Sequence, residues 1–178
     1  MGMRIIIFNG QGGSGKGLTH YFMSSYAGEK YGLCTTKTSI IDPVKELASF
    51  IGWTGAKEQK DRKFLSDLKD LTDKYNDFSM ANLVETIEKQ KHNYHYFFVD
   101  MRDPDDIARL INLYPDTITI LVKRGDKKDF DNHADSNVFN YFYDYVIENN
   151  GTKEELKTTA EYLFDCIHLG DNNEVEKQ

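Results

Sequence analysis

A glycine-rich segment near the start of the chain has the composition that phosphate binding requires. Residues 10–17 read GQGGSGKG, a match to the pattern GxxxxGK, after an apolar run and before a helical stretch. Glycines allow positive φ angles and let backbone N–H groups converge on phosphate oxygens, while a helix N-terminus and a lysine add positive charge. The alternative is a glycine-rich turn that merely joins a strand to a helix. The pattern favours a phosphate loop, whose expected ligating residues are Gly10, Gly12, Gly13, Ser14, Gly15, Lys16, Gly17 and Leu18.

The residue that follows the lysine is unusual for a phosphate loop. Most loops of this type carry a serine or threonine there, whose hydroxyl binds Mg²⁺, whereas this chain has Gly17 and its nearest hydroxyl is on Thr19. An acid elsewhere in the chain can supply a metal ligand instead. Asp100 ends a later apolar run, at the sheet edge where ligands of parallel sheets bind, and we expect it to hold Mg²⁺ directly or through water. The alternative for Asp100 is a cap or loop carboxylate.

Short apolar runs alternate with amphipathic stretches along the chain. The runs at residues 3–8, 35–41, 95–100, 117–123 and 143–147 have the composition of strands, and three of them are continuous, as in strands covered on both faces. The stretches between them contain helix signals, including the cap Asp103 before Pro104 and the capping box of Thr152 and Glu155. The alternation predicts an α/β fold, a doubly wound sandwich with a five-stranded parallel sheet.

Two stretches depart from this alternation. Residues 43–92 contain about three helical segments without a strand, which is too much for one crossover, so we expect a helical lobe beside the sheet. Residues 124–137 are too polar for a core and are expected to form a short lid. Residues 1–170 would then be one domain, with residues 171–178 as a flexible tail.

Composition argues against several classes of protein. In 178 residues, 22 basic and 29 acidic side chains give a formal charge of −7, which argues against nucleic-acid and anionic-membrane binding. No run approaches the length of about 20 apolar residues that spans a bilayer. The two cysteines lie far apart, without the spacing of a zinc site. We therefore expect a cytoplasmic protein in a reducing compartment.

The order of several short motifs resembles a known group of enzymes. A lysine followed by glycine in the phosphate loop is similar to adenylate kinase and related nucleoside monophosphate kinases, although Gly12 and Leu18 stand where that family has proline and threonine. The segments SIIDPVKELA, VDMRD, TITILVKRG and YDYVIENNGTKEEL follow in an order that resembles phage deoxynucleoside monophosphate kinases and the animal type of phosphomevalonate kinase. The resemblance covers most of the chain. It implies a three-layer P-loop kinase sandwich that uses ATP and Mg²⁺.

The same resemblance implies which residues bind the phosphate acceptor. It points to Lys45, and to Arg62 and Lys63 in the following helical segment, although the mixed charges of that segment are also typical of a solvated helix face. Arg102, two residues after Asp100, can grip a phosphoryl group with two hydrogen bonds. Its alternative is a surface ion pair with a nearby acid.

Two residues have more than one interpretation. Asp42 precedes Pro43 and is expected to cap the helix that starts there, but in the similar dephospho-coenzyme A kinases an acid at the end of this strand accepts the acceptor's proton. Arg124 begins the polar loop and can cover the transferring phosphoryl group after closure, or belong to a solvated turn. Together with Lys16 and Asp100, Arg124 completes the set of expected catalytic residues.

These observations predict an ATP-dependent phosphotransferase with a small-molecule phosphate acceptor. A nucleoside or deoxynucleoside monophosphate is the first candidate, and phosphomevalonate or another small phosphorylated metabolite is the second. The alternative from a different class is a nucleotide-binding protein without kinase activity, and Gly17 is the main argument for it. The sequence leaves the identity of the acceptor and the oligomeric state open.

Overall fold

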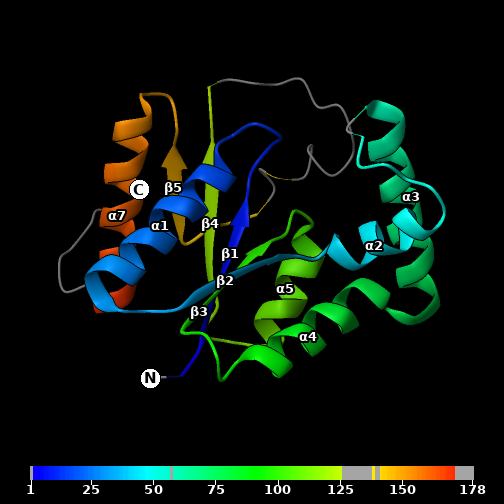
Figure 1. The fold of residues 1–178 in the computed structure, drawn as a ribbon, viewed down its shortest axis with the longest axis horizontal. Coiled ribbons are helices and arrows are strands. Elements are labelled where there is room, and N and C mark those ends of the chain that lie inside the picture. The colour runs from blue at the N-terminus through cyan, green and yellow to red at the C-terminus, as the bar shows by residue number, and fades with distance from the viewer. Residues whose placement is uncertain (1, 57, 126–137, 139–140, 171–178) are drawn as a thin grey trace.

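The computed structural model describes residues 2–56, 58–125, 138 and 141–170 (Figure 1). The strands among them are β1 (Arg4–Asn9), β2 (Thr35–Ser39), β3 (Tyr96–Asp100), β4 (Ile118–Lys123) and β5 (Tyr145–Glu148). The helices are α1 (Lys16–Tyr31), α2 (Asp42–Phe50), α3 (Gln59–Asn76), α4 (Phe78–Gln90), α5 (Pro104–Leu113) and α7 (Lys153–Leu169). Residues 126–137 of the expected lid and the expected tail, 171–178, lie outside the described residues.

The sheet is built from parallel strands in the order β2-β3-β1-β4-β5. The strands β1, β3 and β4 are almost wholly buried, which is why their sequences read as unbroken apolar runs. The edge strand β2, TTKTS, has no buried residue, and its threonines are β-branched. The predicted five-stranded parallel sheet is therefore confirmed, with strand ends that differ from the expected ones by one or two residues.

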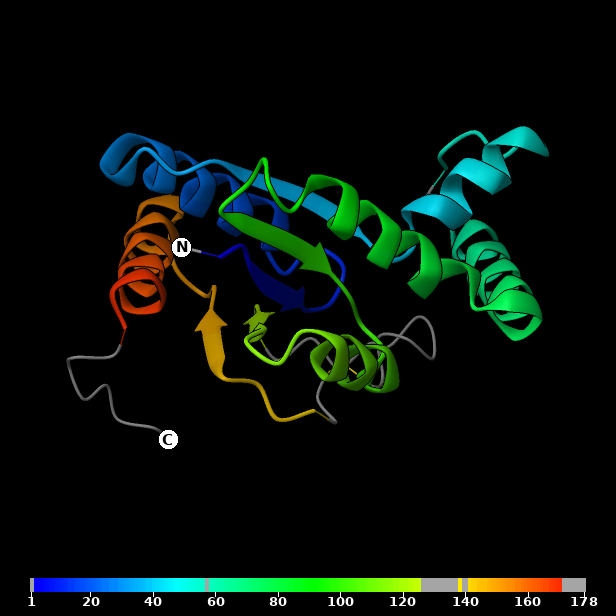
Figure 2. The same cartoon turned by 90° about the horizontal axis from the view of Figure 1, so that it is seen from below.

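Two apolar clusters, one on each face of the sheet, hold the layers together. Successive side chains of β1 point to opposite faces, so Ile6 and Phe8 pack with α1 and α7, whereas Ile5 and Ile7 pack with α4 and α5. Figure 2 shows the sheet between these two pairs of helices. The result is a three-layer α/β sandwich. Among the residues that the structure describes, no helix combines the length and the apolar composition needed to cross a membrane.

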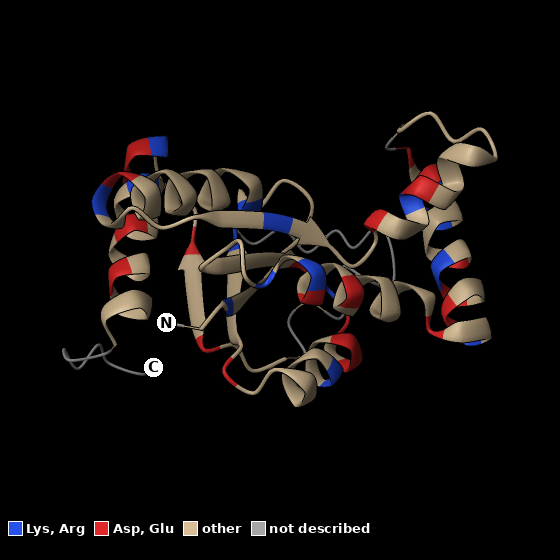
Figure 3. Ribbon diagram, turned by 60° about the horizontal axis from the view of Figure 1, so that its bottom comes forward, with Lys and Arg blue, Asp and Glu red and all other residues tan. Residues whose placement is uncertain are grey.

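Helices α2 and α3 project from the sandwich (Figures 1 and 2). Helix α4 joins them to it, because Met80, Leu83 and Ile87 pack on the sheet while the N-terminal end of α4 directly follows α3. Helix α3 has no buried residue, and acidic and basic side chains are interspersed along it (Figure 3). The helical stretch expected between residues 43 and 92 is thus present as three helices without an intervening strand.

Two of the predicted helix caps are confirmed. The Asp103 side chain accepts a hydrogen bond from the N–H of Asp105 at the start of α5. Thr152 and Glu155 form the reciprocal capping box of α7, in which each side chain accepts a hydrogen bond from the other residue's backbone N–H. These signals are local, so the sequence predicts them well.

The predicted cap of α2 was wrong. Ile41 is already in the helical region (φ −86°, ψ −7°) and takes the N-cap position, so the helix starts one residue earlier than expected and Asp42 lies in its first turn. The carboxylate of Asp42 turns back and accepts a hydrogen bond from the N–H of Ser39 over 2.8 Å. Asp42 therefore closes the turn between β2 and α2 instead of capping the helix.

Candidate functional site

The carboxyl ends of the parallel strands gather the candidate residues at one edge of the sheet. Phe8 of β1 and Ser39 of β2 are both register partners of Asp100 in β3, so the segments that follow these three strands start side by side. On the other side of β1, Lys123 of β4 is paired with Glu148 of β5. The phosphate loop follows β1 and therefore begins between the ends of β3 and β4.

The phosphate loop has backbone geometry that requires glycine. Gly10 has a φ of 146°, and a Cβ atom there would lie 2.2 Å from the carbonyl oxygen of Val122 in β4. Gly15, with a φ of 106°, takes the N-cap position of α1, and its carbonyl oxygen accepts hydrogen bonds from the N–H groups of Leu18 and Thr19. The loop thus leads directly into the N-terminus of α1, where backbone N–H groups and the helix dipole favour an anion.

Lys16 begins α1, and its side chain folds back across the loop. The ammonium group donates hydrogen bonds to the carbonyl oxygens of Gly10 and Gln11, the second over 3.2 Å. Thr19, the nearest hydroxyl residue, is fully buried and donates to the carbonyl oxygen of Gly15 over 3.2 Å. The Thr19 hydroxyl is therefore engaged with the backbone one turn earlier in the chain.

Asp100 stands between a lysine and a histidine. Its Oδ2 atom is 3.0 Å from the ammonium nitrogen of Lys37 on β2, and its Oδ1 atom is 3.4 Å from Nε2 of His20 on α1. The Oδ1 atom is buried and makes no hydrogen bond within the described part of the chain. Lys37 thus neutralises the charge near Oδ2. Burying Oδ1 without a hydrogen bond costs free energy, and a ligand that binds Oδ1 would offset this cost.

His20 is neutral in this environment. Its ring is edge-on to Phe8 and stacked on Phe98, with centroid distances of 4.2 and 5.8 Å. Burial lowers the pKa of His20 from 6.5 to about 4; the negative charge of Asp100 opposes this shift and the positive charge of Lys37 adds to it. A neutral imidazole donates from one nitrogen and accepts at the other, so His20 can orient the Asp100 carboxylate without adding charge.

Buried polar atoms without partners gather near the phosphate loop. Eight buried side-chain nitrogen and oxygen atoms of the described residues lack a hydrogen bond. Five of them lie in the loop, in the first turns of α1 or at the end of β3: Nε2 of Gln11, Oγ of Ser14, both ring nitrogens of His20 and Oδ1 of Asp100. Folded proteins leave few such atoms unpaired. Two of them, Nε2 of His20 and Oδ1 of Asp100, lie 3.4 Å apart. The grouping makes this edge of the sheet the candidate site for a polar ligand.

The two neighbouring basic candidates of α3 have different surroundings. Arg62 approaches the phosphate loop, since its Nη1 atom is 3.9 Å from the place that a Cβ atom on Gly12 would take. Lys63 is exposed and forms an ion pair with Asp67, one turn later, at 2.6 Å. Arg62 therefore extends to the loop, whereas Lys63 has the contacts of a solvated helix face.

Lys45 and Asp42 pair with each other at the start of α2. The ammonium nitrogen of Lys45 is 2.7 Å from Oδ1 of Asp42, whose Oδ2 atom accepts the hydrogen bond from Ser39. Both carboxylate oxygens of Asp42 thus have a donor. The pair lies directly after β2, beside the end of β3 that contains Asp100.

Asn9, the last residue of β1, is a site residue that the sequence did not reveal. Its Nδ2 atom donates to the carbonyl oxygen of Arg102 over 3.0 Å and to the hydroxyl of Tyr143 over 2.7 Å. Its Oδ1 atom accepts from the N–H of Gly10 over 2.7 Å. Asn9 is fully buried, so it fixes the start of the phosphate loop relative to the segment of Arg102, which is half-buried.

Asn149 and Asn150, directly after β5, are two further residues that the sequence did not reveal. Nδ2 of Asn149 donates to the carbonyl oxygen of Ser14 over 2.8 Å, and the backbone N–H of Asn149 donates to the carbonyl oxygen of Lys123, also over 2.8 Å. Oδ1 of Asn150 accepts from the N–H of Gly125 over 2.6 Å. The sequence Asn-Asn-Gly by itself predicts only a turn.

Arg124 follows β4 at the same edge of the sheet and is exposed. The rest of the expected lid, residues 126–137, lies outside the described residues. The role of Arg124 over the transferring phosphoryl group therefore stays a prediction, as does the lid itself.

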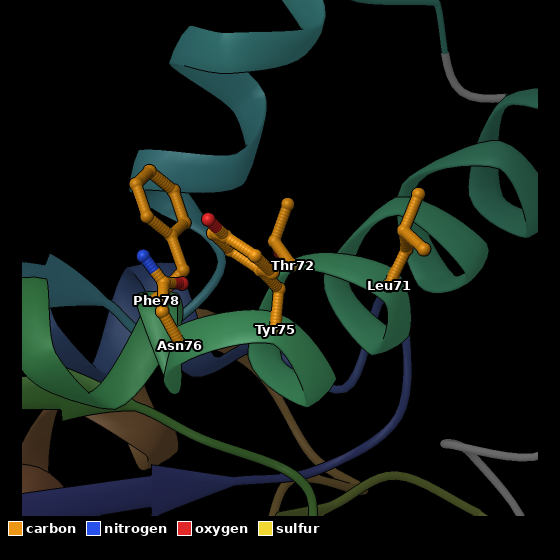
Figure 4. A pocket seen from close by; sticks show the side chains of 5 residues that line it. All are labelled: Leu71, Thr72, Tyr75, Asn76 and Phe78. Carbon is orange, nitrogen blue, oxygen red and sulfur yellow. The ribbon is translucent and has the colours of Figure 1, made fainter.

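A pocket of about 450 Å³ lies on the lobe and not at this edge of the sheet. Its lining side chains come from the end of α3 and the start of α4, and Figure 4 shows Leu71, Thr72 and Tyr75 projecting from the same side of α3. No charged residue lines it. The pocket is therefore separate from the candidate site.

The fold is similar to the folds of two solved kinases. The chain is similar to thymidylate kinase from Ehrlichia chaffeensis, with a TM-score of 0.56 and 16% sequence identity, over 92% of this chain and 99% of that one. It is also similar to a sugar kinase from Janibacter sp. HTCC2649, with a TM-score of 0.50 and 12% identity, over 92% of this chain and 95% of that one. No protein-family model and no curated protein sequence matches the chain. The likeness supports the predicted fold, a three-layer α/β sandwich with a five-stranded parallel sheet.

Proposed function

We propose that this protein transfers the γ-phosphoryl group of ATP to the phosphate of a small acceptor, and that the acceptor is a nucleoside or deoxynucleoside monophosphate. The proposal rests on the approach of Arg62 to Gly12. This contact brings a cation of the lobe next to the loop that would bind the donor's phosphates. The similarity in fold to a thymidylate kinase supports a monophosphate acceptor.

The donor's phosphates would bind on the glycine-rich loop. Backbone N–H groups at the N-terminus of α1 would bind phosphate oxygens, and Lys16 would move from the carbonyl oxygens of Gly10 and Gln11 to the β- and γ-phosphates. That exchange is favourable because hydrogen bonds between charged partners are stronger than those to neutral carbonyls. The unpartnered Oγ of Ser14 and Nε2 of Gln11 are further groups available to the nucleotide.

The acceptor's phosphate would bind between the loop and the lobe. Arg62 and Arg102 have planar guanidinium groups, each able to bind a phosphate with two hydrogen bonds. Lys45 and Lys63 are each held in an ion pair with a neighbouring aspartate, so they would contribute only after those pairs open. Arg62 is the first choice among the lobe's basic residues because its Nη1 atom approaches Gly12 of the loop. Arg124 would offset charge on the transferring group from the end of β4.

Mg²⁺ is the cofactor that this chemistry implies, and Asp100 fits it. In phosphotransferases Mg²⁺ is usually held by one or two carboxylates together with nucleotide oxygens and water, and it neutralises phosphate charge. Asp100 offers its buried Oδ1 atom, which makes no hydrogen bond to any described residue and lies 3.4 Å from Nε2 of His20. The residues described here contain no cluster of three or more His, Cys, Asp or Glu side chains that would hold a metal unaided. Asp100 would therefore be a protein ligand, directly or through water, with the nucleotide supplying others.

The proposed reaction needs positioning and charge stabilisation more than acid–base chemistry. An oxygen of the acceptor's phosphate attacks the γ-phosphorus of ATP, and the bond between that phosphorus and the β–γ bridging oxygen breaks, so ADP leaves. An acceptor phosphate is ionised at neutral pH and needs no strong base. Asp42 would then serve to hold Lys45 and the turn after β2.

Gly17 favours one competing function, nucleotide binding without transfer, because a hydroxyl at this position usually binds the metal. A two-substrate mimic separates the two functions. A compound that joins adenosine to a nucleoside through five phosphates should bind more tightly than ATP or the monophosphate alone if both sites exist. Calorimetry would measure the affinities. An affinity no higher than that of ATP would favour nucleotide binding alone.

Phosphomevalonate and other small phosphorylated metabolites form the second acceptor class. The similarity in fold to a sugar kinase supports this class, because the acceptor of such a kinase is not a nucleotide. Mimics that end in a nucleoside should bind more tightly than mimics that end in a phosphorylated metabolite. The reverse order would assign the acceptor site to that second class.

A further inference from the structure

Asn149 connects the phosphate loop to the end of β4. Its Nδ2 atom donates to the carbonyl oxygen of Ser14 over 2.8 Å, and this hydrogen bond is buried. Its side chain also fills the space beside Gly15, where a Cβ atom would lie 2.3 Å from Nδ2. The backbone N–H of Asn149 is bonded to Lys123, at the end of β4. The sheet, and not the loop, therefore fixes the position of Asn149.

The direction of the Ser14 carbonyl decides where the next N–H group points. The C=O and N–H of one trans peptide point in opposite directions, and the described residues contain no cis peptide. Because Asn149 holds the Ser14 carbonyl, the N–H of Gly15 points away from Asn149. This peptide immediately precedes Lys16 at the N-terminus of α1, where phosphate oxygens would be bound.

The loop itself has little preference for this arrangement. Glycine adopts positive and negative φ with similar ease, so the peptide between Ser14 and Gly15 can turn over at low steric cost. A Ser14 carbonyl turned toward the phosphates would repel their oxygens and remove a donor. The hydrogen bond from Asn149 opposes that rotation, because breaking it leaves a buried amide and a buried carbonyl without partners.

We propose that Asn149 is a positioning residue of the nucleotide site, which selects the phosphate-binding conformation of the loop by holding the Ser14 carbonyl. The inference rests on the proposed function, because that function assigns the loop to nucleotide phosphates. The neighbouring Asn150 contacts a different segment from Asn149, because its Oδ1 atom accepts a hydrogen bond from the N–H of Gly125 after β4. Asn150 is therefore a suitable control position.

Asn149→Asp and Asn150→Asp form a matched pair that tests this role. Each replaces an amide with a carboxylate of similar size and adds the same charge. Asn149→Asp removes the buried donor to Ser14, whereas Asn150→Asp keeps the oxygen that accepts from Gly125 and loses only a long, exposed hydrogen bond of 3.5 Å to Glu148. Calorimetric titration with ADP should give a dissociation constant at least about tenfold higher for Asn149→Asp than for Asn150→Asp, which is the size of effect expected for one hydrogen bond.

Two further measurements separate positioning from stability. Asn149→Ala removes the donor without adding charge. This variant replaces Asn149→Asp in the test if Asn149→Asp does not fold. Its affinity for ADP and for inorganic pyrophosphate should fall by the same factor, whereas its affinity for adenosine, which has no phosphate, should stay within about twofold of wild type. A purely structural role would lower the melting temperature of Asn149→Ala without this selective loss.

The outcomes distinguish the inference from the function on which it rests. Equal ADP affinities for Asn149→Asp and Asn150→Asp, measured well below both melting temperatures, would overturn the positioning role alone. Failure of the wild-type protein to bind ADP or pyrophosphate would overturn the proposed function and this inference with it.

Discussion

The guanidinium group of Arg62 lies against Gly12 of the phosphate loop, with Nη1 3.9 Å from the position that a Cβ atom on Gly12 would take. Arg62 comes from α3, a helix without a buried residue that contacts α2 and α4. The lobe therefore brings a cation to the loop through an element that is not part of the apolar core. A change at Arg62 should accordingly affect function more than folding.

Arg62→Ala should lower kcat/KM for the acceptor by roughly two orders of magnitude. A desolvated bidentate contact to phosphate contributes a few kcal/mol, and each 1.4 kcal/mol corresponds to about a tenfold change. Lys63→Ala, at the next position, should change kcat/KM by less than about fivefold, since Lys63 is exposed and paired with Asp67. The measurement is kcat/KM for the acceptor at saturating ATP. Equal losses in the two variants would contradict a specific role for Arg62.

Asp100→Asn should raise the Mg²⁺ concentration that gives half-maximal activity, because a neutral amide oxygen binds Mg²⁺ more weakly than a carboxylate oxygen. Thr19→Val should leave that concentration nearly unchanged, since the Thr19 hydroxyl is buried and bonded to the carbonyl of Gly15. It should cost only about 1 kcal/mol of unfolding free energy. Activity is measured against Mg²⁺ for wild type and both variants, and a large metal defect in Thr19→Val would restore that hydroxyl as a ligand.

His20 should make the protein less stable as the pH falls from 6.5 to about 4. Burial lowers the pKa of His20 to about 4 in the folded protein, whereas the unfolded chain binds this proton near pH 6.5. The unfolded state holds more protons over this interval, so the free energy of unfolding rises with pH and falls on acidification, by up to about 3 kcal/mol for this residue.

Denaturant unfolding between pH 4 and pH 7 checks this expectation, with His20→Gln as the comparison. The variant should lose less stability on acidification than the wild-type protein, because the difference between the two curves isolates the imidazole. Parallel curves would mean that His20 takes up its proton in the folded protein as readily as in the unfolded chain.

The sequence predicted those features whose signals are local. Unbroken apolar runs identified β1, β3 and β4, because strands buried on both faces need them. Glycine spacing predicted a tight loop between β1 and α1, where Gly10 and Gly15 have positive φ angles, and phosphate binding by that loop stays a prediction. Asp42 shows how a local signal can mislead: the residue precedes a proline as a cap would, but the backbone angles of Ile41 start the helix one residue earlier.

The site residues that the sequence missed owe their roles to the pairing of distant strands. His20 meets Asp100 because Phe8, against which His20 packs, is the register partner of Asp100. Asn149 bonds to Ser14 across a separation of 135 residues. Such contacts follow from the order and register of the sheet, which apolar periodicity alone does not specify.

Transfer of label from ATP tests the central claim most directly. The protein is incubated with ATP labelled at the γ-phosphate and with nucleoside monophosphates, deoxynucleoside monophosphates and other small phosphorylated metabolites in turn, and the label on each acceptor is measured. We expect the wild-type protein to label at least one nucleoside or deoxynucleoside monophosphate. Lys16→Ala should abolish detectable transfer and keep the circular dichroism spectrum, because Lys16 belongs to neither apolar cluster.

Lys30→Ala, at the other end of α1, is the matched control, because Lys30 pairs with Asp165 far along the helix from the loop. It should transfer phosphate at the wild-type rate. Transfer by Lys16→Ala at a near wild-type rate would remove the phosphate loop from the mechanism. ATP binding without label on any acceptor would contradict the assignment of this protein as a kinase.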